Sequence, residues 1–276
     1  MSVPIISVAQ MRAWEKSTWD SGRSVEGVMR RAGKAIAQKA MSMTSPGSDI
    51  LILAGKGNNG GDAKYAVDYI TERHVTLIDA TDPSAAREDL SARIPALQAA
   101  DGLLIDGLFG IGLNRPFKDA WLELIHTINS SALKTLAVDV PSGLDCDSGE
   151  TMGAAVQATA TVTFGAPKTG MIRSNCAHLI GRLELGADIG LIPCPFDNDP
   201  RWTLPNDFTA FPPPRPETGH KGSFGHLAII AGSQGYHGAA AIAARSAHRS
   251  MPGLISVFTT PTAYPLVGAQ LQQSMV

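Results

Sequence analysis

The stretch "LILAGKGNNGGD" (51–62) is an apolar run that leads directly into glycines, two asparagines and an aspartate. A short apolar run before a glycine-rich turn is typical of a buried β-strand that is followed by a helix. Gly55, Gly57 and Gly60 match the G-x-G-x-x-G spacing of dinucleotide-binding loops. Glycines allow a ligand to approach the backbone closely, and the free N–H groups of a helix N-terminus favour an anion. The stretch therefore predicts a strand, a ligand-binding loop and a helix.

The residues between and after these glycines argue against an NAD-dependent dehydrogenase. Asn58 and Asn59 stand where a dehydrogenase turn is small and apolar, and the Asp62 carboxylate would repel a phosphate in the same loop. Asp79 lies near the distance expected for a ribose-binding acid, but aspartate is equally common in ordinary turns. No Lys-Ser or Lys-Thr pair follows Gly60, which excludes a P-loop. The dehydrogenase is kept only as a minor alternative.

Apolar runs alternate with helical periodicity along the first two thirds of the chain. Continuous apolar strands are expected where both faces of a parallel sheet are covered by helices. The pattern predicts an α/β fold, a three-layer doubly wound, mostly parallel sheet with two helices before it. The predicted strands are 50–54, 75–79, 102–106, 135–140, 160–164 and 182–185, and the helices between them are 60–72, 84–99 and 117–129.

Composition limits the classes of partner. The chain has 276 residues and a formal charge of −2, so no general basic field predicts nucleic acid as a partner. Its apolar runs are shorter than the ~20 residues that a membrane-spanning helix needs. The first residues lack the pattern of a secretory signal, and Cys146, Cys176 and Cys194 lack metal-type spacing. We expect a cytoplasmic protein with reduced thiols and no membrane partner.

A change in composition and periodicity near residue 193 predicts a domain boundary. Residues 193–216 contain eight prolines and little periodicity. After them the chain restarts with one strand, glycine loop, helix and strand. A single unit of this kind cannot cover both faces of a sheet. We therefore predict a first domain at 1–212 and a partial α/β domain at 213–276.

Polar side chains stand at the ends of three predicted strands. Asn59 and Asp62 follow the first, Asp106 ends the second, and Asp139 lies at the end of the third with Ser142 just after it. Each aspartate alone could cap a helix or start a turn. In a parallel sheet, however, ligands bind at the carboxyl ends of the strands, where these side chains would meet. Amide, carboxylate and hydroxyl oxygens suit an alkali or alkaline-earth cation better than zinc.

Lys168 follows the predicted strand 160–164 and a Gly-Ala-Pro turn. A lysine in this place could contact a phosphate or take part in proton transfer, and taken alone it could also be a solvated surface residue. Beside three polar strand ends, we favour the functional interpretation.

Four motifs in order, "GKGNNGGD", "DGLFGIGLNRP", "AVDVPSGLD" and "VTFGAPK", closely resemble those of NAD(P)H-hydrate epimerases. The resemblance covers roughly residues 5 to 212. The segment from His220 onward resembles the opening of the ADP- or ATP-dependent NAD(P)H-hydrate dehydratase domain, which has a ribokinase-like fold. The glycine-aspartate motif that holds the nucleotide in that domain would lie beyond residue 276. We therefore predict no dehydratase activity, and ADP or ATP would serve only a complete dehydratase domain.

The resemblance implies a function and a cofactor. The first domain would interconvert the R and S forms of hydrated NADH or NADPH at the C6 hydroxyl, with a potassium ion bound. It implies potassium ligands at Asn59, Asp106 and Ser142. The substrate-binding positions that it implies are Asn58, Asn59, Gly60, Gly61, Asp62, Gly110, Ile111, Gly112, Leu113, Asn114, Arg115, Pro116 and Asp139.

Inversion at C6 requires hydroxide to leave and water to return on the other face, which needs an acid/base and no redox step. We expect Asp139 to be that acid/base, helped by Lys168. Ile111 stands where the family usually has threonine, which implies one hydroxyl contact to the substrate fewer, and Ala63 stands where glycine is common. A noncatalytic nucleotide-binding or scaffolding module of the same fold remains an alternative. Preference for NADH or NADPH hydrate, and homo-oligomer formation, stay open.

Overall fold

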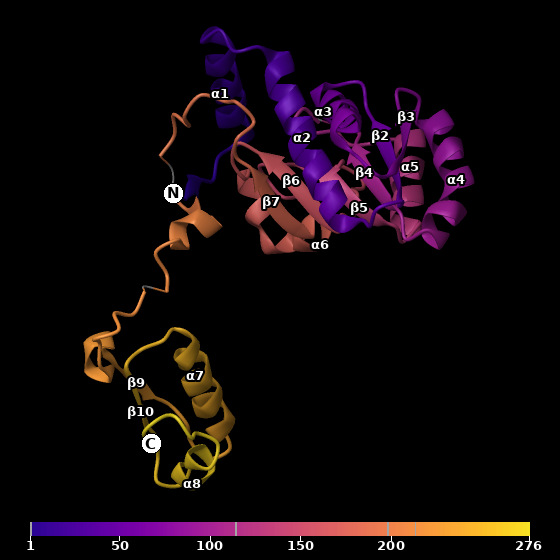
Figure 1. Ribbon diagram of the computed structural model, residues 1–276. Helices are drawn as coiled ribbons and strands as arrows, with labels where there is room; N and C mark the ends of the chain where they lie inside the picture. Colours follow the sequence, from indigo (N-terminus) through magenta and orange to yellow (C-terminus); the bar gives the residue numbers. More distant parts are fainter. Residues whose placement is uncertain (1, 114, 198, 213) are drawn as a thin grey trace. The chain divides into compact units, whose positions relative to one another are not determined.

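The computed structural model describes residues 2–113, 115–197, 199–212 and 214–276 (Figure 1). The chain divides into two compact units, Ser2–Trp202 and Thr203–Val276. The sequence predicted a boundary after residue 212, whereas residues 203–212 belong to the second unit. Each unit is described by itself.

The first unit is built on a sheet of six parallel strands in the order β3-β2-β4-β5-β6-β7. The strands are β2 (Asp49–Ala54), β3 (His74–Asp79), β4 (Leu103–Gly107), β5 (Lys134–Val138), β6 (Ala160–Phe164) and β7 (Arg182–Gly186). All six were predicted, and the doubly wound α/β class is confirmed. The chain runs from β2 to β3 on one side and then crosses to β4 on the other. The connections that leave β2 and β4 therefore run in opposite directions, and such sheets bind ligands in the crevice between these two strand ends.

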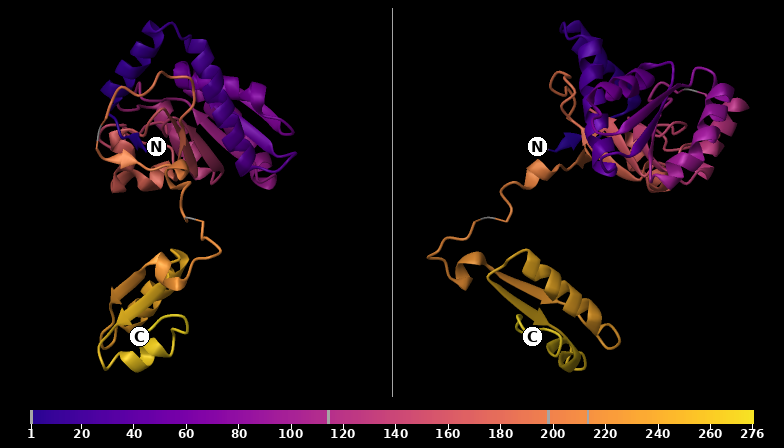
Figure 2. Two further views of the ribbon diagram at one scale, coloured as in Figure 1. Left: turned by 60° about the vertical axis from the view of Figure 1, so that its left-hand side comes forward. Right: turned by 45° about the vertical axis from the view of Figure 1, so that its right-hand side comes forward.

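Helices cover both faces of this sheet, as the right-hand view of Figure 2 shows. One face packs on α2 (Val25–Met43) and α3 (Asn58–Ala66), and the other on α4 (Pro83–Ala99) and α5 (Ala120–Ser130). Successive residues of β2 explain the two cores, because Ile50 and Ile52 face one layer of helices while Leu51 and Leu53 face the other. All four side chains are buried, which accounts for the continuous apolar run.

Two helix boundaries differ from the predicted ones. The helix predicted at 60–72 ends at Ala66 and continues as one 3₁₀ turn, η1 (Val67–Tyr69). The helix predicted from residue 117 starts only at Ala120, because Asp119 has a positive φ of 48° that a helix cannot include. In both places, local backbone geometry overrides the apolar periodicity.

The N-terminal segment packs α1 (Val8–Asp20) against the sheet domain. Ser7 and Gln10 form a capping box at its start. The buried Trp14 indole donates a hydrogen bond of 2.9 Å to the Ile192 carbonyl. A short antiparallel pair, β1 (Val3–Pro4) and β8 (Arg201–Trp202), joins the two ends of the unit. These contacts hold one face of α1 beside the carboxyl ends of the strands.

Short 3₁₀ and helical turns complete the first unit after β6. They are η2 (Thr169–Ile172), η3 (Ser174–Cys176) and α6 (Ala177–Ile180). Together with the 140–155 loop they form a separate small core that includes Cys146 and Cys176. Both thiols are free, as predicted.

The second unit contains the predicted strand, glycine loop, helix and strand. These are β9 (His226–Ile230), α7 (His237–Arg249) and β10 (Leu254–Phe258), and the two strands are parallel. The shorter elements are η4 (Pro205–Phe208), η5 (Lys221–Phe224) and α8 (Tyr264–Gly268). One sheet face packs on α7 and α8, while Ile230 and Phe258 remain 88% and 58% exposed.

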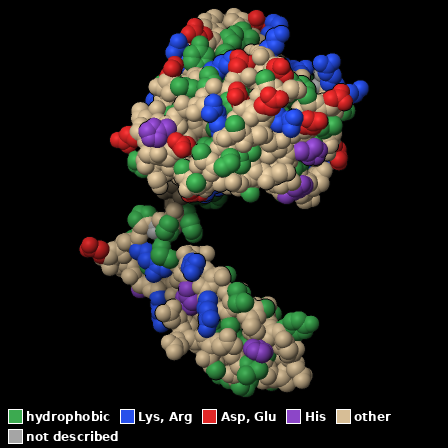
Figure 3. Space-filling model, turned by 90° about the vertical axis from the view of Figure 1, so that its right-hand side faces the viewer, with side chains coloured by type: hydrophobic (Ala, Val, Ile, Leu, Met, Phe, Trp, Pro, Cys, Tyr) green, Lys and Arg blue, Asp and Glu red, His purple; other side chains and the backbone are tan. Residues whose placement is uncertain are grey.

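Charges of both signs are interspersed over the face of the first unit that Figure 3 shows. This distribution agrees with the formal charge of −2. In the part of the chain that the structure describes, no helix is long and apolar enough to cross a membrane.

Candidate active site

A cavity of about 570 Å³ opens at the carboxyl ends of β2, β4 and β5. Its walls come from α1, α2, the start of α3, the loop after β4 and the residue after β5. Volumes of this size hold small-molecule and cofactor ligands. Site residues expected from separate sequence motifs line this one cavity, namely Asn58, Asn59, Asp62, Gly110, Ile111, Gly112, Leu113, Arg115 and Asp139.

The start of α3 forms one wall of the cavity. Gly57 is its N-cap and supplies no side-chain cap, so the first N–H groups of the helix stay available to a ligand. Gly60 packs against the end of β2 so tightly that a Cβ there would lie 1.9 Å from the Gly55 carbonyl oxygen. The glycines therefore bring the helix N-terminus close to the sheet edge, while Asn58 and Asn59 face the cavity.

Asp106 lies under this wall and is completely buried. Ser142 donates to it twice, from Oγ at 2.6 Å and from its backbone N–H at 2.8 Å, and the Leu108 N–H donates at 3.2 Å. No lysine, arginine or histidine among the described residues pairs with it. Burial raises the pKa of Asp106 to about 6, although the bonds from Ser142 oppose the shift.

The Asn59 amide, at the start of α3, is incompletely paired. Its side chain is 7% exposed, and its Nδ2 has no hydrogen-bond partner among the described residues. A Cβ on Gly110 would lie 3.1 Å from Asn59 Oδ1, so Gly110 leaves room for the amide. Ser142 Oγ accepts from the Phe109 N–H at 2.9 Å and lies 3.2 Å from the Phe109 carbonyl oxygen, which adds a fourth kind of oxygen atom. Amide, carboxylate, hydroxyl and carbonyl oxygens here could hold a hard cation.

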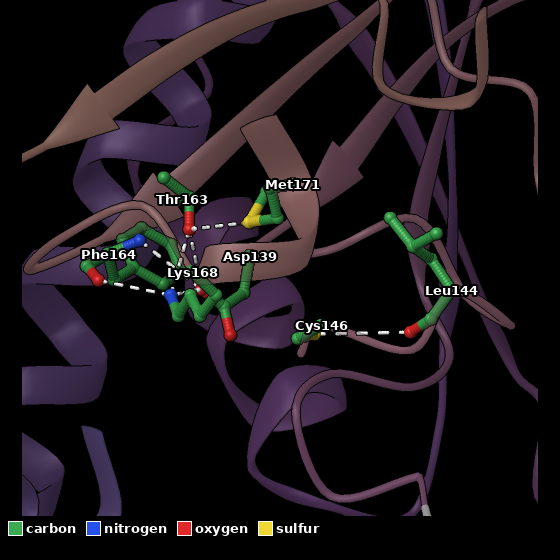
Figure 4. A network of polar contacts seen from close by, with 7 residues as sticks. All are labelled: Asp139, Leu144, Cys146, Thr163, Phe164, Lys168 and Met171. Carbon is green, nitrogen blue, oxygen red and sulfur yellow. Dashed lines mark hydrogen bonds and ion pairs between the residues drawn. The ribbon is translucent and has the colours of Figure 1, made fainter. Parts of the chain in front are cut away.

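Asp139 follows β5 with a positive φ of 61°, an uncommon conformation for a residue with a side chain. Its Oδ1 accepts hydrogen bonds from Lys168 Nζ at 2.6 Å, Thr163 Oγ1 at 3.1 Å and the Phe164 N–H at 3.2 Å (Figure 4). Its other oxygen points away from this cluster and accepts no hydrogen bond from the described residues. The carboxylate is 13% exposed and lines the cavity.

Lys168 is completely buried, so the surface-lysine interpretation is wrong. Its Nζ donates to Asp139 Oδ1, to Thr163 Oγ1 at 2.8 Å and to the Phe164 carbonyl at 3.2 Å. These three bonds use all three protons of the ammonium group. Lys168 does not line the cavity, but it contacts Asp139, which does.

The remaining predicted residues take other places. Gly60, Gly61 and Pro116 lie next to cavity residues without lining the cavity. Asn114 lies outside the described residues. Asp79 pairs with Lys64 at 3.2 Å and accepts from the Thr81 N–H at 3.0 Å. Asp79 does not line the cavity, as its interpretation as a turn residue predicts.

Sequence analysis missed Arg12 and Glu15 of α1, which both line the cavity. Arg12 Nη2 donates to the Ile111 carbonyl at 3.4 Å, so it links α1 to the loop after β4. A signal was present, because Glu15 lies on the same helix face as Met11, Trp14 and Thr18. A carboxylate on an otherwise buried helix face indicates a functional role, and here the Glu15 carboxylate lines the cavity.

Aromatic side chains from the loop after β4 and from α5 were also missed. Phe109 and Trp121 line the cavity, and their ring centroids lie 4.7 Å apart in an edge-to-face arrangement. Phe117 packs against both. Phe109 and Trp121 therefore form an apolar part of the cavity wall, in contrast to the part that carries the carboxylates.

The family model described as YjeF-related protein N-terminus matches residues 25–100 and 67–170. An NAD(P)H-hydrate epimerase of Achromobacter xylosoxidans is 39% identical over 176 residues, which cover 58% of this chain and 83% of that protein. Another, from Limosilactobacillus fermentum, is 32% identical over 206 residues and is covered to 99%, against 69% of this chain. This chain belongs to the NAD(P)H-hydrate epimerase family.

Longer relatives of this epimerase-family chain extend beyond it. The bifunctional NAD(P)H-hydrate repair enzyme Nnr of Coxiella burnetii is 33% identical over 287 residues, covering 96% of this chain and 58% of that protein. The chain spans about half the length of the bifunctional relatives it matches. A crystal structure of yeast ynu0 matches with a TM-score of 0.50 at 16% identity, over 66% of this chain and 87% of that one, which supports the fold.

Proposed function

We propose that the first unit epimerises hydrated NADH or NADPH at the C6 hydroxyl. The observation that carries this proposal is Asp139, which one buried lysine holds by one oxygen while its second oxygen is left for a ligand in the cavity. The names of the relatives give the substrate class, and the cavity of about 570 Å³ is in the range that accepts it.

The geometry suits departure and return of a hydroxyl group. Loss of hydroxide from C6, next to the ring nitrogen, leaves a positively charged ring that carboxylates at the cavity wall stabilise. Asp139 accepts a proton from the water that adds to C6, or donates one in the reverse direction. Lys168 orients Asp139 through the 2.6 Å hydrogen bond, so Lys168 is a positioning residue.

Binding of the dinucleotide is assigned to the start of α3 and its surroundings. Phosphate groups interact favourably with free N–H groups at a helix N-terminus. Lys56 and Arg115 line the same cavity and add positive charge. Phe109 and Trp121 offer flat apolar surfaces for a ring.

A potassium ion fits the group of oxygen atoms around Asp106. The buried carboxylate has no cationic partner among the described residues, and the Asn59 amide has an unpaired end. Oxygen and nitrogen of such an amide exchange places by a simple rotation. One negative charge, with neutral oxygens from Asn59, Ser142 and Phe109, matches a monovalent cation. Bound there, the ion would neutralise Asp106 and fix the loops after β4 and β5.

The two alternatives predict different results. A noncatalytic module would bind the hydrates without interconverting them, and the Asp139–Lys168 pair would then have no chemical use. A dehydrogenase needs an acid for the ribose, but Asp79 is already paired with Lys64 and Thr81. The polar cavity wall favours the epimerase.

The test is an epimerisation assay on separated R and S hydrates of NADH, with potassium or with a large organic cation as the only monovalent ion. We expect each epimer to convert to the same mixture, faster with potassium. In water labelled with ¹⁸O, the new hydroxyl should carry the label. Unchanged epimers under both salts would overturn the proposed function.

A further inference from the structure

Three carboxyl groups from three different elements line the cavity. Glu15 comes from α1, Asp62 from α3, and Asp139 follows β5. Their hydrogen bonding is unequal. Asp139 accepts three hydrogen bonds, one of them from the buried Lys168, whereas Glu15 and Asp62 accept none from the residues that the structure describes. The same cavity contains the unpaired and 7% exposed Asn59 amide, which independently indicates a polar ligand.

Burial in this cavity favours the protonated form of Glu15 and Asp62, because it raises the pKa of both. Burial, together with the negative charges of Asp139 and Glu15, raises the pKa of Asp62 to about 8. The pKa of Glu15 is also raised, first by burial and then by Asp139, while Lys168 and Arg12 oppose the shift. Three neighbouring carboxylates with limited access to water cannot all ionise at neutral pH. The complete set of charged side chains that line the cavity is Arg12, Glu15, Lys56, Asp62, Arg115 and Asp139.

We propose that Asp62, paired electrostatically with Glu15, carries the proton of the general acid for the C6 oxygen, while Asp139 acts as the base. This inference rests on the proposed function and adds Glu15 to its machinery. Titrations of two interacting carboxyl groups belong to the pair rather than to either member. Asp62 is the member that touches the substrate, and Glu15 keeps it protonated through its charge.

The step balances as follows. Protonated Asp62 gives its proton to the C6 hydroxyl, the C6–O bond breaks with its electron pair, and water leaves. The lone pair of the ring nitrogen forms a C=N⁺ bond to C6. A second water adds to the other face of C6, its electron pair closes the C–O bond, and Asp139 takes its proton. Solvent returns one proton from Asp139 to the Glu15–Asp62 pair, so no oxidant or reductant is needed.

The test compares Glu15→Gln with Asp20→Asn in the full chain. Asp20 is a matched control, because it is a carboxylate on the same helix that is 64% exposed and pairs with Lys16. Removing the Glu15 charge makes Asp62 lose its proton at lower pH. We expect the alkaline limb of kcat to move to lower pH, with a loss of about tenfold near pH 8 and little change in KM. Asp20→Asn should keep the wild-type profile, and Glu15→Asp should restore most of it.

A second measurement needs no activity. Infrared spectra of the wild-type protein near pH 7 should show the carbonyl band of a protonated carboxylic acid, and Asp62→Asn should remove it. If the wild type interconverts the epimers but Glu15→Gln keeps its pH profile, or if the band is absent, this inference is overturned and the proposed function stands. If the wild type does not interconvert them, the proposed function itself fails.

Discussion

The two units of this chain start from the same local pattern, an apolar strand followed by a glycine loop and a helix. In the first unit, the loop after β2 meets the loops after β4 and β5, and a cavity forms where they converge. In the second unit, β9 has a single neighbour, β10, and helices pack on one face of the pair. Ile230 is 88% exposed there, whereas Ile52 of β2 is fully buried.

The difference shows that a glycine loop alone does not make a site. The strands β2, β4 and β5 are hydrogen-bonded side by side. The residues at their carboxyl ends, Asp106, Asp139 and Ser142, therefore lie at the same sheet edge as the loop after β2. A parallel sheet also needs both faces covered, which two strands and two helices do not achieve. Position in the sheet, rather than the loop sequence, separates the two units.

The largest expected effect is on catalysis in the first unit. Asp139→Asn removes the proposed base while keeping the size of the side chain. We expect the epimerisation rate to fall by about 10²- to 10⁴-fold. Asp79→Asn is the matched control, since it also ends a strand but does not line the cavity, and it should keep the rate. A wild-type rate for Asp139→Asn would remove Asp139 from the mechanism.

The next effect is on the stability of the first unit. Lys168→Met leaves the Asp139 carboxylate without its cationic partner inside the protein. Breaking a buried pair in this way costs about 3 kcal/mol in the free energy of unfolding. Lys39→Met breaks a similar 2.6 Å pair with Glu184, which is 34% exposed, and should cost about 1 kcal/mol or less. Urea unfolding of both variants measures the difference, and equal losses would contradict the assigned burial.

Equivalent strand substitutions compare the two units directly. Ile52→Ala leaves a cavity in a fully buried strand and should lower the free energy of unfolding of the first unit by about 2–5 kcal/mol. Ile230→Ala changes an 88% exposed side chain and should stay within about 0.5 kcal/mol. Thermal unfolding of the full chain gives both values. A large loss for Ile230→Ala would mean that another surface covers β9.

The smallest effect is expected when the second unit is removed. A chain that ends at Trp202 keeps β8 and its pairing with β1, so its unfolding transition should stay cooperative. Its epimerisation rate should agree with that of the full chain within about twofold. A much lower rate, or a less cooperative transition, would contradict the independence of the first unit.

Much of the fold could be predicted from apolar periodicity. The strand predicted at 50–54 is observed at Asp49–Ala54, and the helix predicted at 84–99 is observed at Pro83–Ala99. The strand predicted at 135–140 ends instead at Val138. Asp139 takes a positive φ there, and periodicity carries no information about a single backbone angle. That angle places the carboxylate beside Lys168.

The amino-acid sequence by itself determined the doubly wound fold class, the order of the motifs and the family, because buried strands and glycine turns leave local patterns. Only the tertiary structure decided that Lys168 is buried, that Asp139 offers one oxygen to the cavity, and that Glu15, Asp62 and Asp139 line the same cavity. Burial and electrostatic repulsion depend on residues far apart in the chain. No local pattern encodes them.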